Sequence, residues 1–191
     1  GIALILKKMG YDVQGSDISK KSKSLDFLKK NKIKIFNNHK SQNTKNAKIV
    51  VISTAIKRSN SEFQAAIKKK LLIIRRADML AHIISLKKNI VISGSHGKTT
   101  ITSLISTILK DANFKPTIVN GGIINSLKTN ARLGNGDWCV IEADESDGSF
   151  LKFNNTIAVV SNVDHEHMDY YKNFSNLIKQ FALFLDKTPL F

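Results

Sequence analysis

The run from Gly94 to Thr100, GSHGKTT, has the composition of a loop that binds the phosphates of a nucleotide. Its two glycines permit backbone dihedrals that direct successive N–H groups inward, and the N-terminus of a following helix adds positive potential. Lys98 can reach the terminal phosphates, and the hydroxyl of Thr99 can bind a magnesium ion. The common motif G-x-x-x-x-G-K-[ST] needs glycine at position 92, where this chain has Ile92. Taken without the other motifs, GSHGKTT is therefore also compatible with an ordinary turn in which Ser95 caps a helix.

Carboxylates and imidazoles follow two further apolar segments. WCVI runs into EADESD, residues 142–147, and TIAVVSNV runs into DHEHMD, residues 164–169. Ligands of open parallel sheets bind outside the carboxyl ends of the strands. If these two strands lie beside the one that ends at Gly94, their polar ends converge on the phosphate loop, where Mg²⁺ would find oxygen ligands. Each acidic cluster alone is also compatible with a solvated turn.

The periodicity of the chain predicts an α/β fold that positions these segments. Strand-like and helix-like stretches alternate, which is typical of parallel sheets built from βαβ units. The helix after Lys98 is predicted to bury Ile101, Leu104, Ile105, Ile108 and Leu109 on a sheet. Helices are expected near residues 2–9, 23–31, 61–70, 77–88, 98–111 and 174–185, and strands near residues 11–17, 32–36, 47–54, 71–76, 89–94, 116–121, 137–144 and 156–163.

The formal charge of +15 is confined to the first part of the chain. Residues 1–88 hold 21 Lys and Arg against 5 Asp and Glu, whereas residues 89–191 hold 9 against 10. A second series of alternating strand-like and helix-like segments begins at the same place, so a domain boundary is expected near Lys88. The lysines are scattered and lack an aromatic platform for bases, which favours a solvated surface over a nucleic-acid groove.

Composition also indicates the cellular compartment and the kinds of partner that the protein has. The single cysteine, Cys139, excludes an internal disulfide framework. The apolar runs are far shorter than the roughly 20 residues of a membrane helix. A cytoplasmic protein with neither nucleic-acid nor membrane partners is therefore expected, and the oligomeric state stays open.

The motifs together resemble those of the Mur ligases of peptidoglycan synthesis. GSHGKTT, EADESDGSF and NVDHEHMDYY carry the resemblance, with QGSDIS, RRADMLA and TNARLG, in order over essentially all 191 residues. The family's G-[TS]-x-G-K-[TS] loop accounts for the short spacing. The resemblance implies a Rossmann-like UDP-sugar domain in residues 1–88 and part of a P-loop-type central ATPase domain in residues 89–191. It also implies that the first strand and most of a glycine-rich loop lie upstream of Gly1, and that a C-terminal domain is absent.

The resemblance further implies an ATP- and Mg²⁺-dependent ligase. It favours the branch that joins L-alanine to the carboxylate of UDP-N-acetylmuramate through an acyl phosphate. A ligase that adds a recycled murein tripeptide to the same sugar nucleotide is the alternative. Folylpolyglutamate synthase is less favoured, because it lacks a UDP-sugar domain. We expect the 191 residues alone to lack turnover, since the amine site belongs to the absent domain.

Site residues are transferred from the family motif by motif. Lys98 and His96 are the expected catalytic residues. The expected metal ligands are Thr99 and Glu142 for one magnesium ion and His167 for a second. The expected nucleotide-binding residues are Gly94, Ser95, His96, Gly97, Lys98, Thr99 and Thr100. The expected sugar-nucleotide contacts are Asp17, Ser53, Thr54, Ala55, Ile56, Asn120, Gly121 and Gly122, and the stretch from Thr129 to Arg132 is expected to approach the sugar or its carboxylate.

The segment EADES offers two glutamates as the metal ligand. Glu142 is preferred because it directly follows the apolar strand, where the backbone is best fixed. Glu145 and His165 are expected to point elsewhere. A local shift in register would exchange the roles of the two glutamates.

Overall fold

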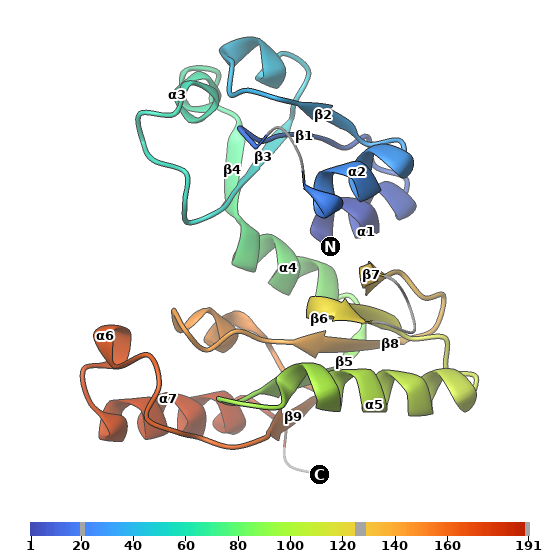
Figure 1. Cartoon of the computed structure of the whole chain (residues 1–191), viewed down its shortest axis with the longest axis vertical. Helices are drawn as coiled ribbons and strands as arrows, with labels where there is room; N and C mark the ends of the chain where they lie inside the picture. The colour runs from blue at the N-terminus through green and yellow to red at the C-terminus, as the bar shows by residue number, and fades with distance from the viewer. Residues whose placement is uncertain (20–21, 125–128, 190–191) are drawn as a thin grey trace. The chain divides into compact units, whose positions relative to one another are not determined.

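The computed structural model describes residues 1–19, 22–124 and 129–189, which form two compact units (Figure 1). One unit comprises Ile2–Leu80, and the other comprises Ala81–Phe191 with Gly1. The division falls within helix α4 (Arg76–Ile84), upstream of Lys88.

The first unit contains two pairs of parallel strands. β1 (Gln14–Ser16) pairs with β2 (Lys34–Phe36), and β3 (Ile49–Ile52) pairs with β4 (Leu72–Arg75). The helices are α1 (Ile2–Lys8), α2 (Lys23–Lys30), the 3₁₀ turn η1 (Ser41–Thr44) and α3 (Ser61–Lys68).

Side-chain caps explain where two of these helices begin. The side chain of Ser22 accepts a hydrogen bond from the backbone N–H of Leu25 at the start of α2. Asn60 accepts from the backbone N–H groups of Glu62 and Phe63 at the start of α3. The strand–helix alternation expected from the sequence is therefore present in this unit.

The second unit is built on a five-stranded sheet of order β7-β6-β8-β5-β9. β5 (Lys88–Ser93) lies between β8 (Trp138–Glu142) and β9 (Ile157–Val160), parallel to both. The condition on which the convergence of the polar strand ends depends, that these two strands flank the phosphate-loop strand, is therefore met. β6 (Thr117–Ile124) is parallel to β8, but β7 (Thr129–Arg132) is antiparallel to β6 and was not anticipated.

Helix α5 (Lys98–Asp111) covers one face of this sheet. Ile101, Ile105 and Leu109 pack on a buried cluster of Ile90, Ile92 and Val140. Leu104 and Ile108 are 59% and 65% exposed, so their expected burial is wrong. The buried stripe instead extends toward Thr102 and Ser106, which are small enough to lie against the sheet.

Helix α7 (Phe174–Asp186) closes the unit together with the 3₁₀ turn η2 (Ser149–Lys152). The ring of Phe150 lies 5.1 Å from that of Phe181 and 5.2 Å from that of Phe184. The short helix α6 (Met168–Tyr171) precedes α7. Among the described residues, no helix has both the length and the apolar character needed to cross a membrane.

Candidate functional site

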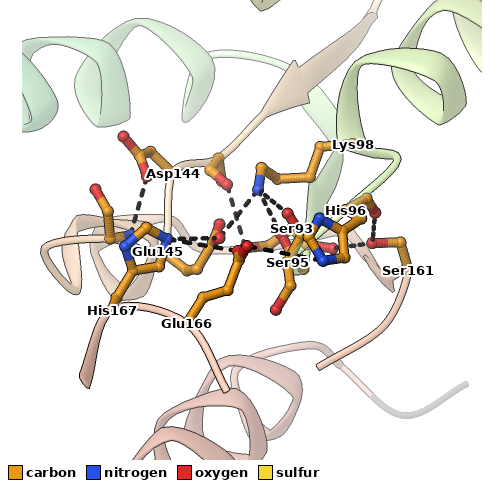
Figure 2. A network of polar contacts seen from close by, with 12 residues as sticks. Ser93, Ser95, His96, Lys98, Asp144, Glu145, Ser161, Glu166 and His167 are labelled. Atoms are coloured by element: carbon orange, nitrogen blue, oxygen red, sulfur yellow. Dashed lines mark hydrogen bonds and ion pairs between the residues drawn. The ribbon is translucent and has the colours of Figure 1, made fainter. Parts of the chain in front are cut away.

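The phosphate loop joins the end of β5 to the start of α5, as the sequence predicts (Figure 2). Gly94 has a φ of +132° and Gly97 a φ of +78°, both in the region that favours glycine. The N-terminal N–H groups of α5 have no partner within the helix and form the positive end of its dipole. The loop therefore has the geometry of an anion-binding site.

The loop is held against the segment that follows β9. Ser95 N–H donates to the backbone oxygen of Asn162 (3.0 Å), and His96 N–H donates to the side-chain oxygen of Asn162 (2.9 Å). Ser95 is buried, and its hydroxyl accepts from the backbone N–H of Asp164 (2.9 Å). Ser95 therefore joins two strand ends instead of capping α5, the alternative that the sequence left open.

Close packing explains why glycine is needed at position 94. A Cβ atom there would lie 2.2 Å from the hydroxyl of Ser161 and 2.8 Å from the backbone oxygen of Asn162. Both distances are too short for a side chain. Gly94 thus lets the segment after β9 approach the loop.

Lys98 is oriented by the loop and by one carboxylate. Its Nζ atom lies 3.0 Å from the backbone oxygen of Ser95, 2.5 Å from that of Gly94 and 3.0 Å from Oε1 of Glu145. The Glu145 side chain is 1% exposed. A buried carboxylate is costly unless it is paired, so Lys98 stabilises Glu145 in place.

Glu145, Glu166 and His167 form a group that could hold a cation (Figure 2). One ligand atom from each lies within 4.8 Å of the others. His167 Nε2 is 3.4 Å from Oε1 of Glu145 and 3.9 Å from Oε2 of Glu166. Oε2 of Glu145 is buried and has no hydrogen-bond partner among the described residues. Two carboxylates and an imidazole, with one open buried oxygen, fit a divalent cation such as Mg²⁺.

The expectation that Glu145 points away from the site is wrong. The backbone oxygen of Glu145 accepts from Tyr171 Oη and from Gly148 N–H, and these bonds turn the segment after β8 inward. Burial raises the pKa of Tyr171, and the nearby Tyr170 and Glu145 raise it further, so its hydroxyl stays a donor at neutral pH. Because of this turn, a residue three positions beyond the strand reaches Lys98.

Glu142 lies at the start of the same segment and contacts a different residue of the loop. Thr99 Oγ1 donates to its Oε2 at 2.9 Å. The structure therefore brings the three expected metal ligands into two groups, Thr99 with Glu142 and His167 with Glu145. Sequence reasoning missed the contribution of Glu145 and of Glu166 to the second group.

The two remaining histidines of the region have different surroundings. His96 Nε2 lies 3.4 Å from Oδ2 of Asp164 and 3.7 Å from Oε1 of Glu166, on the exposed side of the loop. The ring of His165 stacks on that of Phe174 at 4.0 Å, and His165 is not one of the residues of the cation group.

Asn120 extends the site along the sheet. Val119 of β6 pairs with Ile141 of β8, so Asn120 and Glu142 are the next residues on neighbouring parallel strands and project to the same face. Asn120 is 4% exposed, and within the described part of the chain neither of its side-chain polar atoms has a hydrogen-bond partner. Buried amides are normally bonded, so this side chain is available for a polar ligand. The backbone of Gly121 and Gly122 continues β6 beyond it.

The other expected contacts lie in the first unit. Asp17 directly follows β1 and accepts from the N–H of Ser19 at 2.7 Å. Ser53, Thr54, Ala55 and Ile56 directly follow β3, where Ile56 N–H donates to the Ser53 oxygen. Both stretches thus lie at carboxyl ends of strands.

A polar network beside Asp17 was not anticipated. Ser16 Oγ lies 3.0 Å from Nδ1 of His39 and 2.5 Å from Oε2 of Glu62, and Asn43 Nδ2 donates to Oε1 of Glu62 at 2.6 Å. His39 uses the same nitrogen toward Ser16 and Glu62, whereas a catalytic triad needs its two ring nitrogens to face different partners. The network therefore connects β1 to α3 and η1 and is not a nucleophile site.

Two protein-family models match the chain. The model described as Mur ligase family, catalytic domain matches residues 1–88, and the Mur ligase middle domain matches residues 92–190. The UDP-N-acetylmuramate–L-alanine ligase of Pelagibacter ubique is 51% identical over all 191 residues, and that of Brucella anthropi is 49% identical. The chain spans 41% of the length of each of these relatives.

Solved structures give the same family resemblance. The UDP-N-acetylmuramate-alanine ligase from Thermotoga maritima superposes with a TM-score of 0.90 at 28% identity, covering 99% of this chain and 44% of that one. The UDP-N-acetylmuramate:L-alanyl-gamma-D-glutamyl-meso-diaminopimelate ligase from Neisseria meningitides gives a TM-score of 0.89 at 24% identity, covering 99% and 64%. The second likeness concerns the fold alone.

Proposed function

The chain belongs to the Mur ligase family, and we propose that it is part of an enzyme that uses ATP to join L-alanine to the carboxylate of UDP-N-acetylmuramate in peptidoglycan synthesis. The observation that supports this most is the 51% identity, over the whole chain, to a relative named for that reaction. The family membership and the α/β fold are established, whereas the substrates are inferred for the longer protein.

In this proposal the phosphate loop holds the triphosphate of ATP. Lys98 exchanges its contacts with loop carbonyls for phosphate oxygens, while the N-terminal N–H groups of α5 contribute hydrogen bonds. Transfer of a phosphoryl group depends mostly on position and on neutralised charge, which a lysine and a helix N-terminus supply. Gly94, Ser95, His96, Gly97 and Thr100 shape this loop.

Two groups of side chains would hold magnesium. Thr99 and Glu142 form one, and His167 forms the other together with Glu145 and Glu166. Bound Mg²⁺ neutralises phosphate charge. Glu145 lies in contact with both Lys98 and His167, so it connects the loop to the second group.

The reaction that we propose has two steps. A carboxylate oxygen of the sugar nucleotide attacks the γ-phosphorus of ATP, ADP leaves, and an acyl phosphate forms. The amine of L-alanine then attacks the acyl carbon, phosphate leaves, and the nitrogen loses a proton. Asn120, with the backbone of Gly121 and Gly122, would hold the substrate beside the loop, since its buried amide has open donors and an acceptor.

The first unit would bind the UDP portion in a domain of residues 1–88, followed by the ATPase domain of residues 89–191. Asp17 and the Ser53–Ile56 stretch are the proposed contacts, at the carboxyl ends of β1 and β3. The network of Ser16, His39 and Glu62 would fix the end of β1.

We also propose that an upstream strand of the longer protein joins the two strand pairs of this unit. β1 pairs only with β2, and β3 only with β4, among the described residues. An added strand between β1 and β3 would hydrogen-bond to the backbone edges of both and join the two pairs into one sheet.

The alternative is a ligase that adds a recycled murein peptide to the same sugar nucleotide. The fold does not separate the two activities, because ligases named for each give nearly equal TM-scores. The test is phosphate release by the full-length protein with ATP and UDP-N-acetylmuramate, with either L-alanine or the tripeptide added. Release that depends on L-alanine supports the proposal, whereas release that depends only on the tripeptide supports the alternative.

A further inference from the structure

A basic pocket of about 270 Å³ lies at the C-terminal end of α5. Its walls come from the end of α5, the loop leading to β6, the first residues of β6, the last residue of β7 and the turn after it. The lining residues that matter are three cations, Lys110, Lys115 and Arg132, and an apolar floor of Pro116, Ile118 and Leu133.

The three cations are not explained by the general charge of the chain. Residues 89–191 contain 9 Lys and Arg, and three of these line this one pocket. No acidic residue lines it, and in the described ranges none of the three cationic side chains forms an ion pair or a hydrogen bond. Cations that converge without a counter-charge repel one another, which an anion would relieve.

The walls of the pocket are firmly connected. Lys87 Nζ donates to the backbone oxygens of Gly134, at 3.1 Å, and Gly136, and the N–H of Gly136 donates to the oxygen of Lys115. A Cβ atom at Gly134 would lie 2.0 Å from the Lys115 oxygen, so the two loops pack closer than a side chain allows.

The pocket is separate from the phosphate loop. Lys98 and Lys110 are at opposite ends of α5 (Figure 1), twelve residues apart, which corresponds to about 18 Å of helix. Arg132 pairs with Ile118 near the start of β6, whereas Asn120 lies toward the loop. Arg132 therefore lies toward the end of the sheet opposite to the phosphate loop.

We propose that the basic pocket binds a small phosphate-bearing anion, at a site independent of the ATP site. A phosphate dianion balances most of the charge of three cations, whereas a single carboxylate leaves two of them uncompensated. The guanidinium of Arg132 can bond two phosphate oxygens at once, and the lysines act as point charges on either side. The apolar floor would accommodate the carbon skeleton of an organic phosphate.

Calorimetric titration of the full-length protein with glucose 6-phosphate, inorganic phosphate and acetate tests this proposal. The titrations are made in a Lys98→Ala background, which weakens anion binding at the phosphate loop. One bound glucose 6-phosphate per chain is expected, and Lys110→Gln and Arg132→Gln should each weaken it about tenfold. Both residues are exposed, so folding should be retained, and thermal unfolding checks this. Lys179→Gln, an exposed lysine of α7, is the matched control and should leave the affinity unchanged.

The relative affinities of the anions and the effects of the variants distinguish the possible ligands. Equal affinity of glucose 6-phosphate and inorganic phosphate, lost in both pocket variants, would support a site for free phosphate, and a preference for the sugar would support an organic phosphate. Unchanged affinity in Lys110→Gln and Arg132→Gln, or binding of acetate as tight as that of the phosphates, would overturn the proposal.

Discussion

Glu145→Gln is expected to raise the magnesium concentration needed for half-maximal turnover of the full-length enzyme. Glutamine keeps the size of the side chain and an oxygen that can accept from Lys98, but it removes the charge. Glu145 is the buried carboxylate of the cation group, 3.0 Å from Lys98 and 3.4 Å from His167. The substitution therefore tests charge with little change in shape.

The magnitude follows from the charges of the group. Glu145 and Glu166 carry two negative charges and Lys98 one positive charge, so the net charge rises from −1 to 0 on substitution. Loss of a charged ligand should shift the magnesium midpoint by about tenfold to a hundredfold, or roughly 1.4 to 2.7 kcal/mol. The free energy of unfolding should change less, because the lost Coulomb attraction to Lys98 is offset by the removed cost of burying the carboxylate.

The assay is the initial rate of ATP-dependent ligation across a magnesium titration. Glu142→Gln is measured in parallel, because this residue contacts Thr99 and belongs to the other proposed group. Asp186→Asn, at the exposed end of α7, is the control and should keep the wild-type midpoint. A normal midpoint in Glu145→Gln, together with a large shift in Glu142→Gln, would refute the second cation group and leave Glu145 as a partner of Lys98 alone.

Three further predictions concern the loop and the core. Lys98→Ala should lower turnover by about a hundredfold or more while changing UDP-sugar affinity little, because the lysine acts on phosphate; an equal loss of affinity in a binding titration would contradict this. Gly94→Ala should destabilise the chain in urea unfolding by roughly 1–3 kcal/mol or more, since its Cβ would clash with Ser161, whereas Gly10→Ala, with φ of +92° and open space, should cost less. Burial raises the pKa of the Cys139 thiol from 9.0 to about 12, so the stability tied to this thiol should be intact below pH 9 and fall by roughly 1.4 kcal/mol per pH unit between 9 and 12. A Cys139→Ala variant should lose this part of the pH dependence of the free energy of unfolding. A variant with the same slope as the wild type would contradict the raised pKa of the thiol.

Most of the helices and strands around the loop could be predicted from the sequence, whereas the order of the strands entered only as a condition. Apolar runs such as NIVISG and WCVI mark buried strands, and β5 does lie between β8 and β9. The antiparallel strand β7 was missed because TNAR has one apolar residue and no clear alternation.

The position of Glu145 could not be predicted in the same way. The spacing of apolar residues predicts where a strand lies, but it does not predict the direction of the chain in a turn three residues beyond that strand. Here the turn depends on Gly148, at φ of +71°, and on the bond from Tyr171, 26 residues away in the sequence. Contacts of this kind need tertiary structure, and the basic pocket around Arg132 likewise depends on two loops that only the fold brings together.

The most direct test of the proposed function uses UDP-N-acetylmuramate whose carboxylate carries ¹⁸O at both oxygens. The full-length enzyme is incubated with this substrate, ATP, magnesium and L-alanine, and the released phosphate is analysed by mass spectrometry. An acyl phosphate requires one carboxylate oxygen to leave with the phosphate, so each phosphate should contain one ¹⁸O atom. Phosphate free of ¹⁸O would show that ATP is hydrolysed by water, and would contradict the assignment of this chain to an acyl-phosphate ligase.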